Sequence, residues 1–198
     1  MIGKLCEKQV FQGITVSLTK RKIQKYQRQL GNGHDVELHL TVADLYTHLG
    51  EDSLALESYC AAETSLLQNQ KPLTTTQSDQ LIKIYKRILA ISPLDEETVH
   101  KLSQEYIRRH LDYRAIELYT TLAERFIRQG KYREATRQYQ HVFALEPGSI
   151  TARMTCANLY CRLGEIVQGA QEYAHIGDLY FEYQKFDGAL EYYRESLK

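Results

Sequence analysis

The feature that most constrains this chain is an internal repeat with an offset of 54 residues. The segment Tyr85–Pro93 (YKRILAISP) aligns with Tyr139–Pro147 (YQHVFALEP) at this offset. Repeats of this kind are single structural units that bury their apolar faces only by stacking on one another. The sequence therefore predicts a stack of similar units. Further pairs at the same offset are Tyr106 with Tyr160, Ala115 with Gly169, Tyr119 with Tyr173, Ala135 with Ala189, and Tyr139 with Tyr193.

Each copy of the repeat contains three helical patterns separated by turn signals. In the middle copy these patterns cover about Asp95–Arg109, Asp112–Gln129 and Tyr132–Leu145, and they end near His110, Gly130 and Pro147. The chain has only three prolines and 43% hydrophobic residues, which suits packed helices. We therefore predict an all-α chain of about nine to ten antiparallel helices.

The repeat predicts the domain organisation. The solenoid is expected to cover 36–198, with copies at about 36–93, 94–147 and 148–198, after an N-terminal arm and basic helix in 1–35. The first copy fits when about six extra residues around Lys71–Thr76 form a loop. A helix is expected over Thr19–Leu30. The role of residues 1–18 is open, since Ile14–Leu18 alternates like a strand without a partner strand, which leaves a flexible arm or docking elsewhere.

The spacing of small and aromatic residues resembles the tetratricopeptide repeat (TPR) family, in a variant with a three-helix super-repeat. The family pattern has small residues at positions 8 and 20, aromatics at 11 and 24, Gly at 15 and Pro at 32. His110 and Gln184 stand where Gly is usual. The resemblance covers about Val36–Lys198 and implies a right-handed α-solenoid. Matching residues in the best copies are Ala43, Tyr46, Gly50, Ala55 and Tyr59, then Ala123, Phe126, Gly130, Ala135, Tyr139 and Pro147, then Ala157, Tyr160, Gly164, Gly169 and Tyr173.

The composition excludes several classes of function. The 25 basic and 25 acidic residues give no global attraction to nucleic acid or lipid. The sequence contains none of the common nucleophile, phosphate-loop or metalloprotease motifs, so we expect neither an enzyme nor a cofactor or metal site. No secretory signal or membrane span is recognised, which predicts reduced cysteines and a cytoplasmic protein. Similarity to three-helix repeats suggests a bacterial source.

In the TPR family, ligands lie in a concave groove, and this implies candidate residues here at repeat positions 9 and 13. An ordinary pairing of side chains one helical turn apart is the competing interpretation. Only Asn158 matches the family's carboxylate clamp, and the clamp lysine is missing, so a clamp is not expected. The candidate groove residues are Asp44 with His48, Glu124 with Arg128, and Asn158 with Arg162.

A basic cluster on the N-terminal helix is a second candidate surface, formed by Lys20, Arg21, Lys22, Lys25 and Arg28. Such a cluster can contact acidic protein, nucleic acid or lipid head groups, or it can be a solvated helix face. A nucleic-acid-associated factor is therefore an alternative function, although nucleic acid is not the expected partner.

The C-terminal helix is expected to leave an apolar edge at Leu190, Tyr193 and Leu197. Either the parent chain continues, or a partner covers this edge, which includes self-association with a second copy. The predicted function is a non-catalytic scaffold or adaptor that binds a peptide segment or domain of another protein. A regulatory repeat domain of a larger multidomain protein is the remaining alternative.

Overall fold

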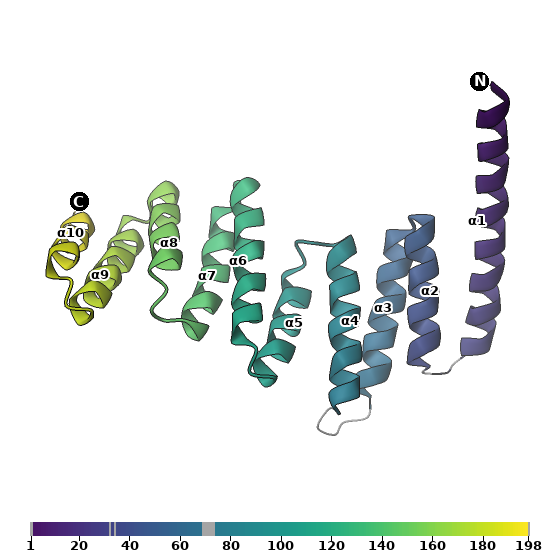
Figure 1. The fold of residues 1–198 in the computed structure, drawn as a ribbon, viewed down its shortest axis with the longest axis horizontal. Helices are drawn as coiled ribbons and strands as arrows, with labels where there is room; N and C mark the ends of the chain where they lie inside the picture. The colour runs from purple at the N-terminus through teal and green to yellow at the C-terminus, as the bar shows by residue number, and fades with distance from the viewer. Residues whose placement is uncertain (1, 32, 34, 69–73, 198) are drawn as a thin grey trace. The chain divides into compact units, whose positions relative to one another are not determined.

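The computed structural model describes residues 2–31, 33, 35–68 and 74–197, with side chains from Ile14 onward. The described residues form ten α-helices and no strand (Figure 1). The fold is an all-α solenoid, as predicted. Its contacts divide the chain into two compact units, Met1–Ser92 and Pro93–Lys198, each described by itself below.

In the first unit, each helix packs against the next along the chain. Its second and fourth helices are also bridged by side chains, because Arg87 binds Asp44 and Gln80 donates to Glu37. These two alternate helices therefore lie close enough for their side chains to bind each other. The four helices are α1 (Ile2–Leu30), α2 (Val36–Leu49), α3 (Asp52–Leu67) and α4 (Thr75–Ile91).

In the second unit, helices also pack in chain order. The last three begin at 150, 166 and 186, each 54 residues after its counterpart at 96, 112 and 132. The starts thus keep the offset found in the sequence, while the grouping of three helices into one repeat unit stays a prediction. The six helices are α5 (Glu96–Arg108), α6 (Asp112–Arg128), α7 (Tyr132–Leu145), α8 (Ile150–Leu163), α9 (Ile166–Glu182) and α10 (Phe186–Ser196).

Two local predictions are corrected. Residues Ile14–Leu18, for which the sequence leaves open a flexible arm or docking elsewhere, instead lie inside α1 together with the predicted helix Thr19–Leu30. The loop predicted around Lys71–Thr76 falls partly on residues 69–73, which lie outside the described residues. Its last two residues already belong to α4, because Thr74 and Gln77 form a capping box that starts the helix there. The division of the chain at position 35 stays a prediction.

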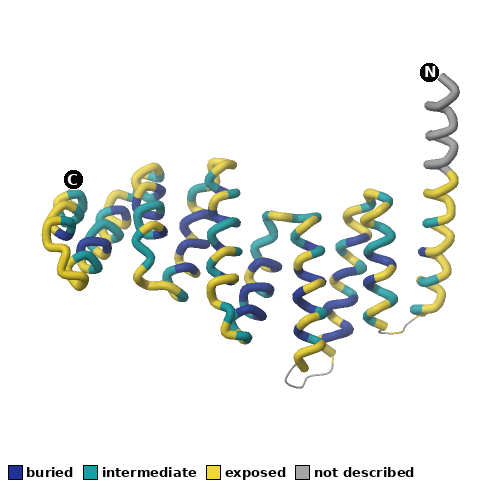
Figure 2. Tube along the Cα trace, in the orientation of Figure 1, coloured by how far each residue is buried: buried dark blue, intermediate teal, exposed yellow. Residues whose placement is uncertain are grey.

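Small residues are buried where helices meet, as the repeat pattern predicts. At these contacts the side chain is no larger than a methyl group, so two backbones approach closely and aromatic rings fill the space beside them. Tyr59 and Tyr119 are each 2% exposed, and buried positions recur along the helices from α2 to α9 (Figure 2). The fully buried alanines are Ala43, Ala55, Ala62, Ala115, Ala123, Ala135 and Ala157.

The turns between paired helices require a left-handed backbone. Gly50, Gly130 and Gly164 have φ of 72°, 72° and 74°. His110 and Gln184, which occupy the same slot, have φ of 56° and 58°. A side chain in this region is strained, so these two turns keep the repeat geometry at a cost in stability.

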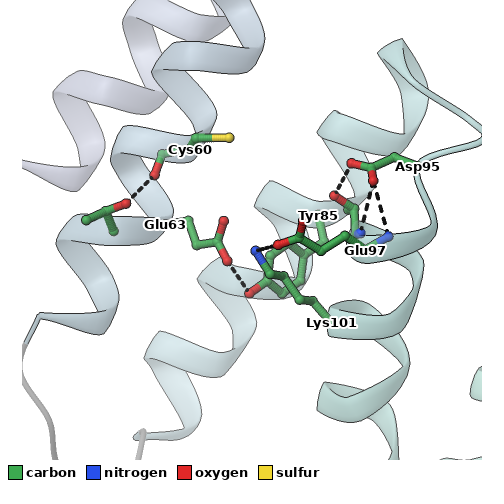
Figure 3. A network of polar contacts seen from close by, with 8 residues as sticks. Cys60, Glu63, Tyr85, Asp95, Glu97 and Lys101 are labelled. Atoms are coloured by element: carbon green, nitrogen blue, oxygen red, sulfur yellow. Dashed lines mark hydrogen bonds and ion pairs between the residues drawn. The ribbon is translucent and has the colours of Figure 1, made fainter.

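Several buried polar groups are satisfied within their own unit. Glu63, 8% exposed, accepts a hydrogen bond of 3.0 Å from Tyr85 (Figure 3). Asp95 begins α5 by accepting from the backbone N–H groups of Glu97 and Thr98. Gln138, 3% exposed, donates to Glu96 at 2.8 Å. These bonds remove the penalty of burying unpaired polar atoms.

A substitution at Gly177 tests whether the close approach of α9 and α10 is required for stability. A Cβ added there would lie 2.6 Å from Cε1 of Tyr193 on the next helix. We expect Gly177→Leu to lower the free energy of unfolding by about 1–3 kcal/mol, because α9 and α10 must separate. Urea denaturation followed by circular dichroism measures this. Gln171→Leu, which adds the same side chain at an exposed position of α9, is the control. Equal stability of the two variants would contradict the role of Gly177.

Candidate partner-binding surfaces

A hydrogen bond from a tyrosine to a polar residue 15 positions earlier recurs along the chain. Tyr59 donates to Asp44 at 2.7 Å, joining α3 to α2. Tyr173 donates to Asn158 at 3.0 Å, joining α9 to α8. A third pair, Tyr193 and Asp178, joins α10 to α9 at 2.7 Å. The helix α9 thus supplies the donor of one hairpin and the acceptor of the next.

The candidate groove residues of the first unit are arranged differently from the prediction. Asp44 is half-buried, and its second carboxylate oxygen lies 3.1 Å from Nη1 of Arg87. His48, one turn further along α2, is exposed. Within the described residues, Asp44 is paired with Tyr59 and Arg87 and not with His48. Sequence reasoning missed Arg87, because it lies two helices away and follows no repeat position that the family uses.

The candidate groove residues of the second unit are exposed on α6 and α8. Glu124 and Arg128 lie on α6. On α8, Asn158 accepts the bond from Tyr173, and the Arg162 guanidinium lies 5.7 Å from the ring centroid of Tyr132. The structure therefore orients Asn158 and Arg162 through neighbouring aromatic rings. That these four side chains form the floor of one groove stays a prediction.

A cluster of two histidines and one tyrosine on α5, α6 and α7 was not predicted. His100 Nδ1 lies 2.9 Å from Tyr119 Oη, and the ring of His141 stacks on Tyr119 with centroids 4.6 Å apart. The two imidazole centroids are 5.4 Å apart. Partial burial, followed by the nearby His100, lowers the pKa of His141, while the carboxylate of Glu96 opposes this. Spacing along the chain gave no signal, because His100 and His141 lie on helices that are not consecutive.

The basic cluster lies on α1, and all five of its side chains are exposed. Lys20 lies 3.5 Å from Glu51, an exposed contact that contributes little. Arg21, Lys25 and Arg28 line a shallow surface depression together with Gln24 and Gln29. The structure therefore gathers three of the five predicted cations on one strip of the helix.

The cysteines carry no metal-binding geometry in the described part of the chain, where no cluster of three or more potential ligands occurs. Burial, with a smaller effect of Glu172, raises the pKa of the Cys156 thiol to about 12. Cys60 and Cys161 are exposed, and the Cys6 side chain lies outside the described residues. Among the described helices, none has the length and apolar character needed to cross a membrane.

Comparisons with known proteins give similar solved structures but no matching family. No family model matches the sequence, and no curated protein matches it. A crystal structure of MamA is 19% identical, with 94% of this chain and 91% of that chain covered and a TM-score of 0.37. TTC0263, a thermophilic TPR protein of Thermus thermophilus, is 18% identical, with 96% of each chain covered and a TM-score of 0.35. YrrB, described as a TPR protein with an unusual peptide-binding site, is 15% identical, with coverage of 88% and 90% and a TM-score of 0.30.

The chain has an all-helical fold with tetratricopeptide-like hairpins. Its own hairpins carry this assignment, because small residues lie at the helix contacts and left-handed turns lie in the predicted slots. The resemblance predicted from the sequence is confirmed, while the three-helix super-repeat stays a prediction.

The Tyr59 bond gives a prediction about stability. Tyr59→Phe should lower the free energy of unfolding by about 1.5 kcal/mol, because the half-buried carboxylate of Asp44 loses a charge-assisted hydrogen bond. Urea denaturation measures the loss. Tyr193→Phe removes the equivalent bond at an exposed site and should have a smaller effect. A larger effect of Tyr193→Phe would contradict this ranking.

The His141 environment gives a prediction about pH. Because its pKa is lower in the folded chain than in the unfolded chain, the unfolded chain takes up the proton first as pH falls. The associated stability is present above about pH 6.5 and is lost as pH falls toward the folded pKa. His141→Gln should therefore show a shallower loss of stability on acidification, measured by thermal unfolding at several pH values. His175→Gln, at an exposed position of α9, is the control, and an unchanged slope in His141→Gln would refute the prediction.

Proposed function

We propose that this chain is a non-catalytic scaffold or adaptor that binds a peptide segment or domain of another protein. The partner would contact side chains at repeat positions 9 and 13, which in the second unit are Glu124, Arg128, Asn158 and Arg162. All four are exposed. No catalytic residue or cofactor is part of the proposal, and a cytoplasmic location is proposed with it.

The observation that carries the proposal is the recurring tyrosine bond. In the hairpin of α8 and α9, Tyr173 on α9 orients the side chain of Asn158 on α8 through this hydrogen bond. Side chains held by the fold lose less conformational entropy when a partner binds than side chains that are free to rotate. A polar row oriented in this way is therefore suited to recognition as well as to folding.

Two exposed arginines indicate which kind of residue the proposed partner carries. Arg128 and Arg162 lie near the ends of α6 and α8, and both guanidinium groups are exposed. Within the described residues, neither forms an ion pair with a neighbouring carboxylate. Arginine is enriched among the residues that dominate protein interfaces, and its guanidinium group binds carboxylates in a bidentate manner. We infer that the partner segment carries acidic residues.

The affinity of the intact chain for its partner tests the proposal. A pulldown identifies bound proteins, and a titration with a purified partner follows. Arg128→Glu combined with Arg162→Glu should weaken binding at least about tenfold, because two attractive contacts become repulsive. Lys83→Glu combined with Lys86→Glu makes the same change in net charge at exposed positions of α4 and should leave binding unchanged. Equal recovery of every partner by the first variant and the wild type would reject the groove.

One observation favours a second function. Residues 14–30 contain five basic and no acidic side chains, a composition that suits contact with a polyanion. A nucleic-acid-associated factor would bind through this helix, and its affinity would fall steeply as salt is raised. A role as the regulatory repeat domain of a larger protein is compatible with either partner.

A further inference from the structure

The helix α1 has two opposite faces. One face packs on α2 and includes Ile23, which is 3% exposed, and Gln27, which donates to Tyr46 Oη at 3.0 Å. The other face is a stripe at spacings of one and two helical turns, and it is exposed along its length. This free stripe of α1 consists of Ile14, Leu18, Arg21, Lys25 and Arg28.

The free stripe is apolar at one end and basic at the other. Ile14 and Leu18 are 55% and 53% exposed. The three cations that follow meet no acidic residue on their own helix, since residues 14–30 contain none. Over residues 14–30 the stripe therefore has exposed apolar side chains and cations with no acidic residue beside them on the helix.

The helix α10 and the residue that follows it form an exposed apolar flank of Phe186, Leu190 and Leu197, which are 54%, 53% and 86% exposed. Within the described residues, α10 packs against α9. At the equivalent place in α7, 54 residues earlier, Thr136 is only 5% exposed, and α7 packs against both α6 and α8. The exposed flank of α10 thus corresponds to a side of α7 that is buried by neighbouring helices.

This flank is bordered by acidic side chains. Asp187 and Glu191 are exposed one turn apart beside the apolar residues. The helix carries three acidic residues, Glu195 being the third, against the single basic Arg194. Its charge is therefore opposite to that of α1, and its apolar stripe has the same one-turn spacing.

We propose that α1 of one molecule packs against α10 of a second copy of this chain. Ile14 and Leu18 would cover the apolar flank, and Arg21 and Lys25 would face Asp187 and Glu191. The contact joins two different surfaces, so association continues beyond a dimer unless a ring closes. This proposal does not rest on the partner-binding function, because it uses neither α6 nor α8.

Charge exchange between the two helices tests the proposal on the full chain, purified free of nucleic acid. One variant carries Arg21→Glu, Lys25→Glu and Arg28→Glu, and the other carries Asp187→Lys and Glu191→Lys. Sedimentation equilibrium gives the mass of each as concentration rises. The wild type should associate, more weakly as salt is raised from about 0.05 to 0.5 M, because the facing charges are screened. Each variant alone should associate at least about tenfold more weakly.

Mixing the two variants is the decisive measurement. The acidic α1 of the first then meets the basic α10 of the second, and the remaining two surfaces also match, so the mixture should associate again. Restored association also shows that both variants are folded. A mixture that stays unassociated would overturn the proposal, as would a wild type of single-chain mass at every concentration. If only one variant loses association, the contact joins the same helix of two copies, α1 with α1 or α10 with α10. This result would also overturn the proposal. Retention of duplex DNA by a monomeric wild type would assign the stripe to nucleic acid instead.

Discussion

Close approach of helix backbones at alanine and glycine is the interaction on which the rest of this structure depends. Ala115 and Ala135 are fully buried, and Tyr119 and Tyr139, one turn further along the same helices, are 2% and 4% exposed. A larger side chain at these positions would move a whole helix, because helices are rigid and each packs on its neighbours in the chain. The small residues therefore fix where the aromatic residues lie, and the aromatic residues fix the polar groups that they bind.

Three tyrosines link the packing of helices to the polar groups on their surface. The ring of Tyr59 belongs to the core and those of Tyr173 and Tyr193 are half-buried, whereas the hydroxyl groups of all three reach the polar row at position 9. One side chain thus contributes apolar burial and also orients a surface group. Three of the 15 tyrosines of the chain have this dual use. A phenylalanine would fill the same space and leave the polar row without its donor.

Most of the fold could be predicted from the sequence, because its signals are local and repeated. The helix Tyr132–Leu145 was predicted to the residue, since a left-handed turn precedes it and Pro147 closely follows it. The helical structure of Ile14–Leu18 was not predicted, because five residues are too few to distinguish the alternating pattern of a strand from one side of a long helix. The candidate site was less predictable. Arg87 reaches Asp44, and His100 reaches His141, across helices that are not consecutive, and no spacing rule encodes such contacts.

The order in which helices pack has a consequence for how the chain acquires its structure. Helix packing in each unit joins segments that are close in sequence, so the chain closes only short loops as it folds. Such a topology favours rapid assembly that can begin at any hairpin and spread in both directions. Helices at the margins of the array, supported on one side, then open most often, and their amide protons exchange with solvent before those of the interior.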